Sequence, residues 1–225
     1  MTSPLSYGLW KENWAVDWPC GFDVRVANVW DDDLRLKELT RESLGGGGCI
    51  CRNGDCLSFS CSTFAACVEC GKRCKNDGCS NNRLKVGKWC RVQVFDTGVD
   101  GRGFRLRSLT KLVKGMLVVE YAGVVRTHHE FINMQSCSTY VARLNDLLVV
   151  DASEKGSIAR YINHSCSPNC VMEMWIVDGL PRLGIFALQD ILKLEELTFD
   201  YKQSSRILEL GTKCLCGSEN CKRVI

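Results

Sequence analysis

The chain has 225 residues, of which 45% are hydrophobic and 24% charged, the balance of a globular protein with one sizeable core and small appendages. No basic start leads into an apolar run at the N-terminus, and no apolar stretch is long enough to cross a bilayer, so we expect neither secretion nor a membrane partner. The net charge of +3 is too small to argue for nucleic acid by itself. The 16 cysteines are the unusual feature, and without a secretory route they favour metal ligands over disulfides.

The N-terminal segment, residues 1–48, holds four of the six tryptophans and ends in four glycines, which favour a flexible joint. Residues 31–44 open with acidic side chains, which a helix dipole favours at that end, so a short helix is expected there. We expect the tryptophans to pack against the main body, because large aromatic side chains are usually buried. A partner-binding face is the alternative.

Residues 49–79 carry eight cysteines and few large apolar residues, so this stretch cannot fold around a hydrophobic core. Most neighbouring cysteines are separated by one to four residues, which lets a chain turn back and present several thiolates to one tetrahedral ion. Zinc would supply the folding free energy that the missing core cannot, and disulfides are the alternative. The eight residues are Cys49, Cys51, Cys56, Cys61, Cys67, Cys70, Cys74 and Cys79.

From Lys88 onward the sequence changes to short β-branched runs separated by glycine, Asn-Asp or Asp-Gly turn signals. Asn145-Asp146 and Asp178-Gly179 each lie between two such runs, as hairpin turns do. The one convincing helix in this half spans residues 153–162 and opens at Ser153. We therefore expect a mainly β fold with few helices. The predicted strands fall within residues 89–95, 115–125, 147–153, 170–188 and 195–201.

The chain ends in a second, smaller cysteine cluster at Cys214, Cys216 and Cys221. Three thiolates leave a tetrahedral zinc one ligand short, so a fourth has to come from elsewhere. Two candidates, Cys166 and Cys170, lie in the stretch ARYINHSCSPNC at residues 159–170. Taken alone, this stretch is compatible with a nucleophile and its base, a metal site or a hydrogen-bonded turn.

Five motifs in order resemble those of the SET-domain lysine methyltransferases. They are DGRGF at 100–104, EYAG at 120–123, RYINHSCSPNC at 160–170, ELTFDY at 196–201 and CLCGSENC at 214–221. The resemblance covers residues 49–225, whereas residues 1–48 match no family that we can name. It implies a SET-domain β-clip of small curved sheets, in which the NHS segment passes close to the FDY strand in a knot-like crossing.

The resemblance also implies zinc modules on both sides of the catalytic domain. An AWS module would span residues 49–86, the SET domain 87–205 and a post-SET zinc loop 206–225. This combination is typical of the enzymes that act on lysine 36 of histone H3.

In the AWS module of this family, two zinc ions share one cysteine among seven ligands. Carried over to this chain, one ion takes Cys49, Cys51, Cys56 and Cys61, and the other takes Cys56, Cys70, Cys74 and Cys79. Cys67 is then surplus, and the alternative is two separate four-cysteine sites that include it. The post-SET zinc takes Cys166, Cys214, Cys216 and Cys221. Free thiols are then expected at Cys20, Cys67, Cys90, Cys137 and Cys170.

The catalytic residues implied by the resemblance are Tyr201, Phe199 and Tyr121. The Tyr201 hydroxyl would orient the lysine amine and the methyl group, although burial in the core is the ordinary explanation for an isolated strand tyrosine. Phe199 lies on the same strand face. A phenylalanine there leaves room for di- or trimethylation in this family, because it cannot hold a water against the amine. Tyr121 resembles a channel-wall tyrosine.

The implied methyl donor is S-adenosyl-L-methionine. Its contacts carry over to the backbone of Gly101 and Arg102, to Thr139 and Tyr140, and to Asn163 and His164. Asn163 can donate and accept hydrogen bonds, while the backbone beside His164 can read the adenine edge, so His164 is not expected to act as a general base. Arg160 is expected to hold a nearby loop rather than to contact a ligand.

The sequence departs from the family pattern at Val124, at Arg102 and across residues 203–211, which bear on substrate preference more than on reaction type. The predicted function is transfer of methyl groups to a lysine of histone H3, with lysine 36 as the first candidate. The expected partner is a histone H3 tail or nucleosome, with contact to nucleosomal DNA, in the nucleus on the chromosome, for a monomeric enzyme. One alternative is a non-catalytic zinc module that binds chromatin. Another, a Cys-His hydrolase, is disfavoured because His164 and Cys166 are badly placed as base and nucleophile on one turn.

Overall fold

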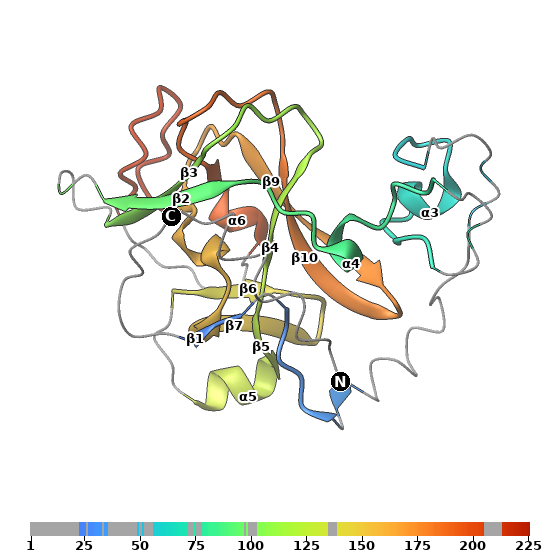
Figure 1. Ribbon diagram of the computed structural model, residues 1–225. Coiled ribbons are helices and arrows are strands. Elements are labelled where there is room, and N and C mark those ends of the chain that lie inside the picture. The colour runs from blue at the N-terminus through green and yellow to red at the C-terminus, as the bar shows by residue number, and fades with distance from the viewer. Residues whose placement is uncertain are drawn as a thin grey trace.

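The computed structural model describes residues 23–25, 27–32, 34–35, 49, 51, 56–71, 74, 78–96, 98, 103–134, 139–204 and 213–225. Across these residues the fold is mainly β, with small sheets and short helices, as predicted (Figure 1). None of the described helices is long and apolar enough to span a membrane.

A three-stranded antiparallel sheet lies at the centre of the molecule. It consists of β4 (Leu117–Tyr121), β10 (Leu180–Ala187) and β9 (Cys170–Val177), in that order. Asp178 and Gly179 connect β9 to β10 with φ values of 50° and 83°, the left-handed pair that a two-residue hairpin turn requires. The predicted turn at this position is confirmed.

A second sheet combines β1 (Asp23–Val24), β7 (Leu148–Gly156) and β5 (Gly123–Thr127), with β6 (Val141–Arg143) also paired to β7. The turn between β6 and β7 contains Asn145, whose side-chain oxygen accepts hydrogen bonds from the backbone N–H groups of Leu147 and Leu148, each at 2.9 Å. The second predicted hairpin is thereby confirmed.

Two short pairs complete the sheets. β2 (Val92–Asp96) and β3 (Phe104–Ser108) form an antiparallel pair, while β8 (Asn163–His164) and β11 (Thr198–Phe199) pair in parallel. The β8–β11 pair places Phe199 opposite His164, so the NHS segment does lie beside the FDY strand, as predicted.

The helix predicted at residues 153–162 is wrong in its extent and type. β7 continues through Gly156 because Lys155 and Gly156 pair with β1 and Gly156 also pairs with Gly123 of β5. Only Ile158–Tyr161 form a helical turn, the 3-10 helix η1. The cap is Ser157, not Ser153: its hydroxyl donates to the Glu120 carbonyl at 2.7 Å and accepts from the Ala159 N–H at 3.3 Å.

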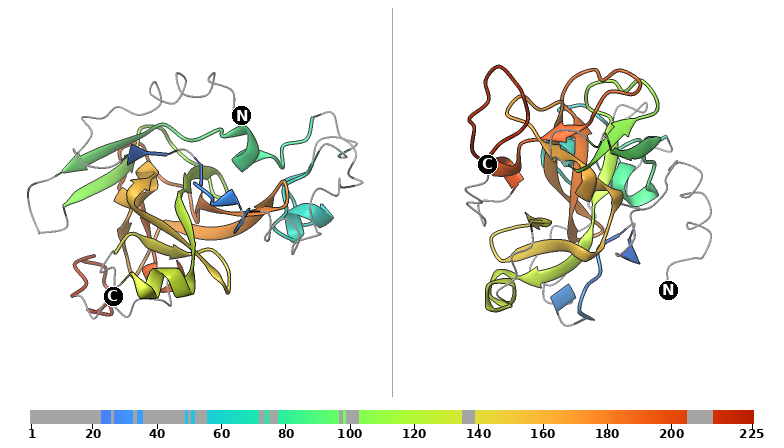
Figure 2. Two further views of the ribbon diagram at one scale, coloured as in Figure 1. Left: turned by 90° about the horizontal axis from the view of Figure 1, so that it is seen from below. Right: turned by 90° about the vertical axis from the view of Figure 1, so that its left-hand side faces the viewer.

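The cysteine-rich segment packs against the outer edge of β9. It contains α3 (Ser62–Ala65) and leads into α4 (Arg83–Val86). The N–H of Glu69 donates to the Ile176 carbonyl, and the Ile176 N–H donates to the Cys67 carbonyl, each at 2.9 Å. Figures 1 and 2 show α3 at the opposite end of the molecule from the C-terminal loop.

The main core gathers buried side chains from β2, β3, β4, β7, β9 and β10. Trp30 packs against it, as predicted for the N-terminal tryptophans, whereas Trp10, Trp14 and Trp18 lie outside the described residues. Of the helix predicted at residues 31–44, only residues 31, 32, 34 and 35 are among the described residues, so most of this prediction lies outside them.

Candidate active site and cysteine clusters

Tyr201 stands at the start of α6 (Tyr201–Ser204), directly after β11, and it is fixed at both ends. Its hydroxyl donates to the Ile162 carbonyl at 2.9 Å, and its backbone N–H donates to Nδ1 of His164 at 3.2 Å. The ring of the buried Phe199 lies 4.9 Å from the Tyr201 ring, between centroids. The strand pair β8–β11 therefore holds two predicted catalytic side chains against each other.

Tyr121, at the end of β4, faces the same site. Burial raises its pKa, and the phenol of Tyr201 raises it further. Burial also raises the pKa of Tyr201, with the nearby phenol of Tyr140 adding to the effect. Both phenols therefore keep their protons at neutral pH. The structure brings together Tyr121, Phe199 and Tyr201, all three predicted catalytic residues.

The predicted methyl-donor contacts come from three parts of the chain. Gly101 and Arg102 lie outside the described residues, but Phe104, which follows them closely, accepts a hydrogen bond from Nδ2 of Asn163 at 3.1 Å. The start of β3 is thus tied to β8. Thr139 and Tyr140 are exposed and immediately precede β6.

Arg160 contacts the segment that contains Tyr140 and holds it in place. Its guanidinium lies 3.8 Å from the centre of the Tyr140 ring, and Nη1 donates to the Ser153 carbonyl at 2.7 Å. These contacts agree with the expected loop-holding role. The stacked pair joins η1 to the segment that carries Thr139 and Tyr140.

His164 is 6% exposed as a whole residue, and both nitrogens of its ring have protein partners. Nδ1 receives the Tyr201 N–H, and Nε2 lies 3.3 Å from Sγ of Cys166. Burial lowers the pKa of His164, against the opposing effect of Asp200. The sequence assigned only the backbone of this residue to the site, because the partners of the ring come from elsewhere in the fold.

The C-terminal cysteines form a compact four-sulfur group with Cys166. The Sγ atoms of Cys166, Cys214, Cys216 and Cys221 all lie within 4.8 Å of one another. The Lys222 N–H donates to Cys166 Sγ at 3.3 Å. Burial opposes ionisation of Cys216, but the Ser218 hydroxyl and backbone N–H groups lower its pKa to about 5. The second candidate, Cys170, is buried in the main core instead.

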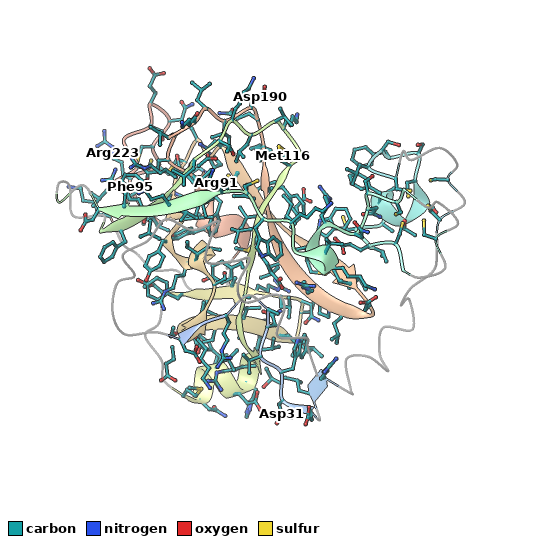
Figure 3. The ribbon with its side chains drawn as sticks, viewed as in Figure 1. Asp31, Arg91, Phe95, Met116, Asp190 and Arg223 are labelled. Atoms are coloured by element: carbon teal, nitrogen blue, oxygen red, sulfur yellow. The ribbon has the colours of Figure 1, made fainter. Side chains whose placement is uncertain are left out.

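The N-terminal cysteines form one continuous cluster around α3, where Figure 3 shows the sulfur atoms gathered. Within it, two four-sulfur groups each fit within 4.8 Å, and both contain Cys49 and Cys56. The groups are Cys49, Cys51, Cys56, Cys61 and Cys49, Cys56, Cys70, Cys74. The second differs from the predicted set by having Cys49 in place of Cys79. Burial raises the pKa of Cys79, and the nearby thiols of Cys74, Cys56 and Cys70 add to the effect.

Cys67 is not part of this cluster and packs against the main core. Neither of the two compact four-sulfur groups contains Cys67. None of the fourteen described cysteines forms a disulfide.

The sulfur spacing fits zinc. Four thiolates about 2.3 Å from a tetrahedral zinc would lie about 3.8 Å from one another. The observed separations are 3.5 Å for Cys49–Cys56, 3.7 Å for Cys49–Cys74 and 3.9 Å for Cys166–Cys214. All-sulfur donor sets in this arrangement match structural zinc sites, which are closed and four-coordinate.

Polar side chains connect the N-terminal sulfurs. The Thr63 hydroxyl lies 3.2 Å from Cys61 Sγ and 2.9 Å from Cys70 Sγ. Nδ2 of the fully buried Asn81 donates to Cys70 Sγ at 3.4 Å and to the Val68 carbonyl at 2.9 Å. Burial opposes ionisation of Cys61, yet hydrogen bonds from Thr63 and the Phe64 backbone lower its pKa to about 7.

Comparison with known proteins agrees with this geometry. Residues 103–202 match the SET domain family. Mouse histone-lysine N-methyltransferase SETD2 is 33% identical over 221 residues, covering 91% of this chain and 9% of the relative. The H3 lysine-36 specific histone-lysine N-methyltransferase of Candida glabrata is 36% identical over 206 residues, 87% of this chain and 28% of the relative. Histone-lysine N-methyltransferase ASHR3 of Arabidopsis thaliana is 32% identical over 223 residues, 95% of this chain and 42% of the relative.

A SET domain is therefore present within the chain, at residues 103–202. The relatives named above are histone-lysine N-methyltransferases, and the chain spans between 9% and 42% of their lengths.

Proposed function

We propose that this chain is a protein-lysine methyltransferase that transfers methyl groups from S-adenosyl-L-methionine to a lysine of histone H3. The observation that carries the proposal is the convergence of Tyr121, Phe199 and Tyr201 beside β8, where Asn163 is tied to the start of β3. The SET domain match and the names of the relatives support the same reaction.

The site residues suit the activation of a lysine amine. A lysine has a pKa of about 10.4 in water, so it must lose a proton before it can attack. The buried aromatic side chains disfavour the ammonium form, because desolvation penalises charge. The ammonium would first lose one proton to solvent. The neutral amine would then form a C–N bond to the methyl group as the S–C bond of the donor breaks, leaving a methylammonium and the neutral thioether S-adenosyl-L-homocysteine.

Tyr201 would align this in-line attack. Its proton is engaged by the Ile162 carbonyl, so its oxygen lone pairs are available to the amine and to the methyl hydrogens. The bound donor supplies a methyl group already activated by a positive sulfonium, which electron-rich rings and phenol oxygens attract. Alignment and exclusion of water are then the main tasks of the protein.

The methyl donor would be held by Asn163 and the backbone beside His164, by Thr139 and Tyr140, and by Gly101 and Arg102. Phe199 favours di- or trimethylation because its ring offers no hydroxyl to hold a water against the amine. Three zinc ions would occupy the cysteine groups, two around α3 with Cys56 shared and one at the C-terminal site.

The proposed substrate is lysine 36 of histone H3 within nucleosomes, which contact the enzyme through the histone tail and DNA, in the nucleus. This follows the specificity for H3 lysine 36 in the name of the Candida glabrata relative. We propose that the enzyme acts as a monomer.

The test combines the protein with radiolabelled S-adenosyl-L-methionine and a panel of nucleosomes and free histones, beside a Tyr201→Phe control. Label on histone H3 with the unchanged protein, and loss of label with the control, is expected. If neither protein transfers label and calorimetry detects no binding of the donor, a non-catalytic chromatin-binding module replaces the proposal.

A further inference from the structure

We propose that the His164 imidazole is a positioning residue that links the catalytic tyrosine to the C-terminal zinc site. Its role in turnover rests on the function proposed above, but the link itself is visible in the contacts of the ring. Nδ1 lies 3.2 Å from the backbone nitrogen of Tyr201, and Nε2 lies 3.3 Å from Sγ of Cys166.

The partners of the ring determine its tautomer. A backbone N–H can only donate, so Nδ1 must be the acceptor in its contact with Tyr201. A neutral imidazole whose Nδ1 accepts carries its proton on Nε2, and that proton then points at Cys166. The sulfur of a zinc-bound cysteine is a thiolate, which accepts this hydrogen bond. One ring therefore connects a metal ligand to the catalytic residue.

The surroundings leave the ring little freedom. His164 is 6% exposed as a whole residue, and its ring packs edge-on against the Tyr201 ring, with centroids 5.4 Å apart. The Asp200 carboxylate is 3.7 Å from Nδ1, too far to compete with the Tyr201 N–H for that atom.

Both anchors of Tyr201 come from one short segment. The Ile162 carbonyl receives the Tyr201 hydroxyl, and His164, two residues later, receives its backbone N–H. Cys166, two residues later again, joins the cysteine group. The zinc site would thereby hold in place the segment that sets the direction of the catalytic phenol.

Two substitutions each preserve one of the two hydrogen bonds of the His164 ring and remove the other. The side-chain oxygen of His164→Asn lies near the position of Nδ1 and can still accept from Tyr201, but nothing reaches Cys166. The side-chain amide of His164→Gln reaches the position of Nε2 and can donate to Cys166, but the Tyr201 N–H loses its acceptor. Each variant keeps the backbone at residue 164.

We expect His164→Gln to be the more damaging substitution for kcat and His164→Asn the more damaging one for zinc affinity. In steady-state assays on nucleosomes, kcat should fall about tenfold further in His164→Gln than in His164→Asn, the size of one hydrogen bond, with the KM for the histone substrate alike in both. In competition with a chelator, the C-terminal cysteine group should bind zinc about tenfold more weakly in His164→Asn than in His164→Gln. Equal losses of kcat and of zinc in both variants would overturn the proposal.

A measurement on the unaltered, zinc-loaded protein covers the case in which a variant fails to fold. The chain has three histidines, so the ring nitrogens of His164 can be resolved by 15N NMR against those of His128 and His129. We expect a neutral ring with its proton on Nε2. A ring with its proton on Nδ1 would refute the link, whether or not the protein methylates any histone tested.

Discussion

The hydroxyl oxygen of Tyr201 lies 2.9 Å from the carbonyl oxygen of Ile162, to which it donates its proton. This contact fixes the direction of the phenol from the segment that also contains Asn163 and His164. Because burial raises the pKa of Tyr201, the residue acts as a neutral, oriented oxygen and not as a base at neutral pH.

Replacing Tyr201 with phenylalanine tests this role. The ring and its packing against Phe199 are kept, so we expect kcat to fall by about 10²–10³, the usual effect of removing one oriented polar group from an active site. Single-turnover methylation of nucleosomes measures the rate, and calorimetry checks that the methyl donor still binds. A rate within threefold of the unaltered protein would contradict the assignment.

Phe199→Tyr should shift the products toward monomethyl lysine. The added hydroxyl can hold a water near the amine, which takes the space that a second or third methyl group needs. Mass spectrometry of a substrate peptide measures the product ratio. Phe95→Tyr, on β2, is the matched control and should leave that ratio as it is. An unchanged ratio in Phe199→Tyr would remove this residue from product control.

Cys166→Ser should reduce the zinc content from three ions per chain to two and weaken binding of the methyl donor, because Cys166 adjoins the segment with Asn163 and His164. The control is Cys67→Ser. Since Cys67 packs against the main core and not in the cysteine cluster, all three ions should stay. Metal analysis gives the count, and loss of zinc from the control would favour two separate sites that include Cys67.

Asn81→Leu should weaken zinc binding in the N-terminal cluster by about ten- to a hundredfold, as the loss of a group that orients metal ligands generally does. The substitution removes the donor to Cys70 Sγ and Thr63 from a fully buried position. Chelator competition measures the affinity, and Ser62→Ala, on the exposed neighbour of Thr63, is the control. Equal affinities in both variants would show that the Asn81 amide does not act on the metal site.

Arg83→Met should lower the free energy of unfolding by about 2–4 kcal/mol, since several cation–π contacts and one hydrogen bond are lost together. The Arg83 guanidinium lies 4.5–5.5 Å from the ring centres of Phe186, Trp175 and Phe64, and it donates to the Gly115 carbonyl at 2.9 Å. Arg83→Lys keeps the charge and should lose less. Denaturant titration compares the two variants, and equal losses would argue that the positive charge contributes nothing and that the planar guanidinium carries the whole effect.

Several local features could be predicted because neighbouring residues decide them. The Asp178-Gly179 turn needs two left-handed residues, and its two flanking strands are visible as β-branched runs. The helix α5 (His128–Asn133) could also have been found, because Thr127 and Glu130 form a capping box that the sequence displays. The residues after Ser153 were predicted as helix because their pairing with β1 and β5, which keeps Lys155 and Gly156 extended, involves partners distant in sequence.

For the site, the motifs identified residue types and the fold supplied their relationships. The four-sulfur group of Cys166 with the C-terminal cysteines followed from the resemblance, since three nearby thiolates need a fourth. The contacts of the His164 ring could not be predicted. They depend on the register of β8 against β11, which places residues 37 positions apart within hydrogen-bonding distance.

The pairing of residues 67–69 with Ile176 bears on the tendency of the protein to aggregate. β9 is the last strand of its sheet, and the cysteine-rich segment is what covers that edge near Trp175. An uncovered edge offers free backbone donors and acceptors to other chains. A fragment that begins after α4, or a protein stripped of zinc at α3, should therefore self-associate and precipitate while its catalytic side chains are still intact.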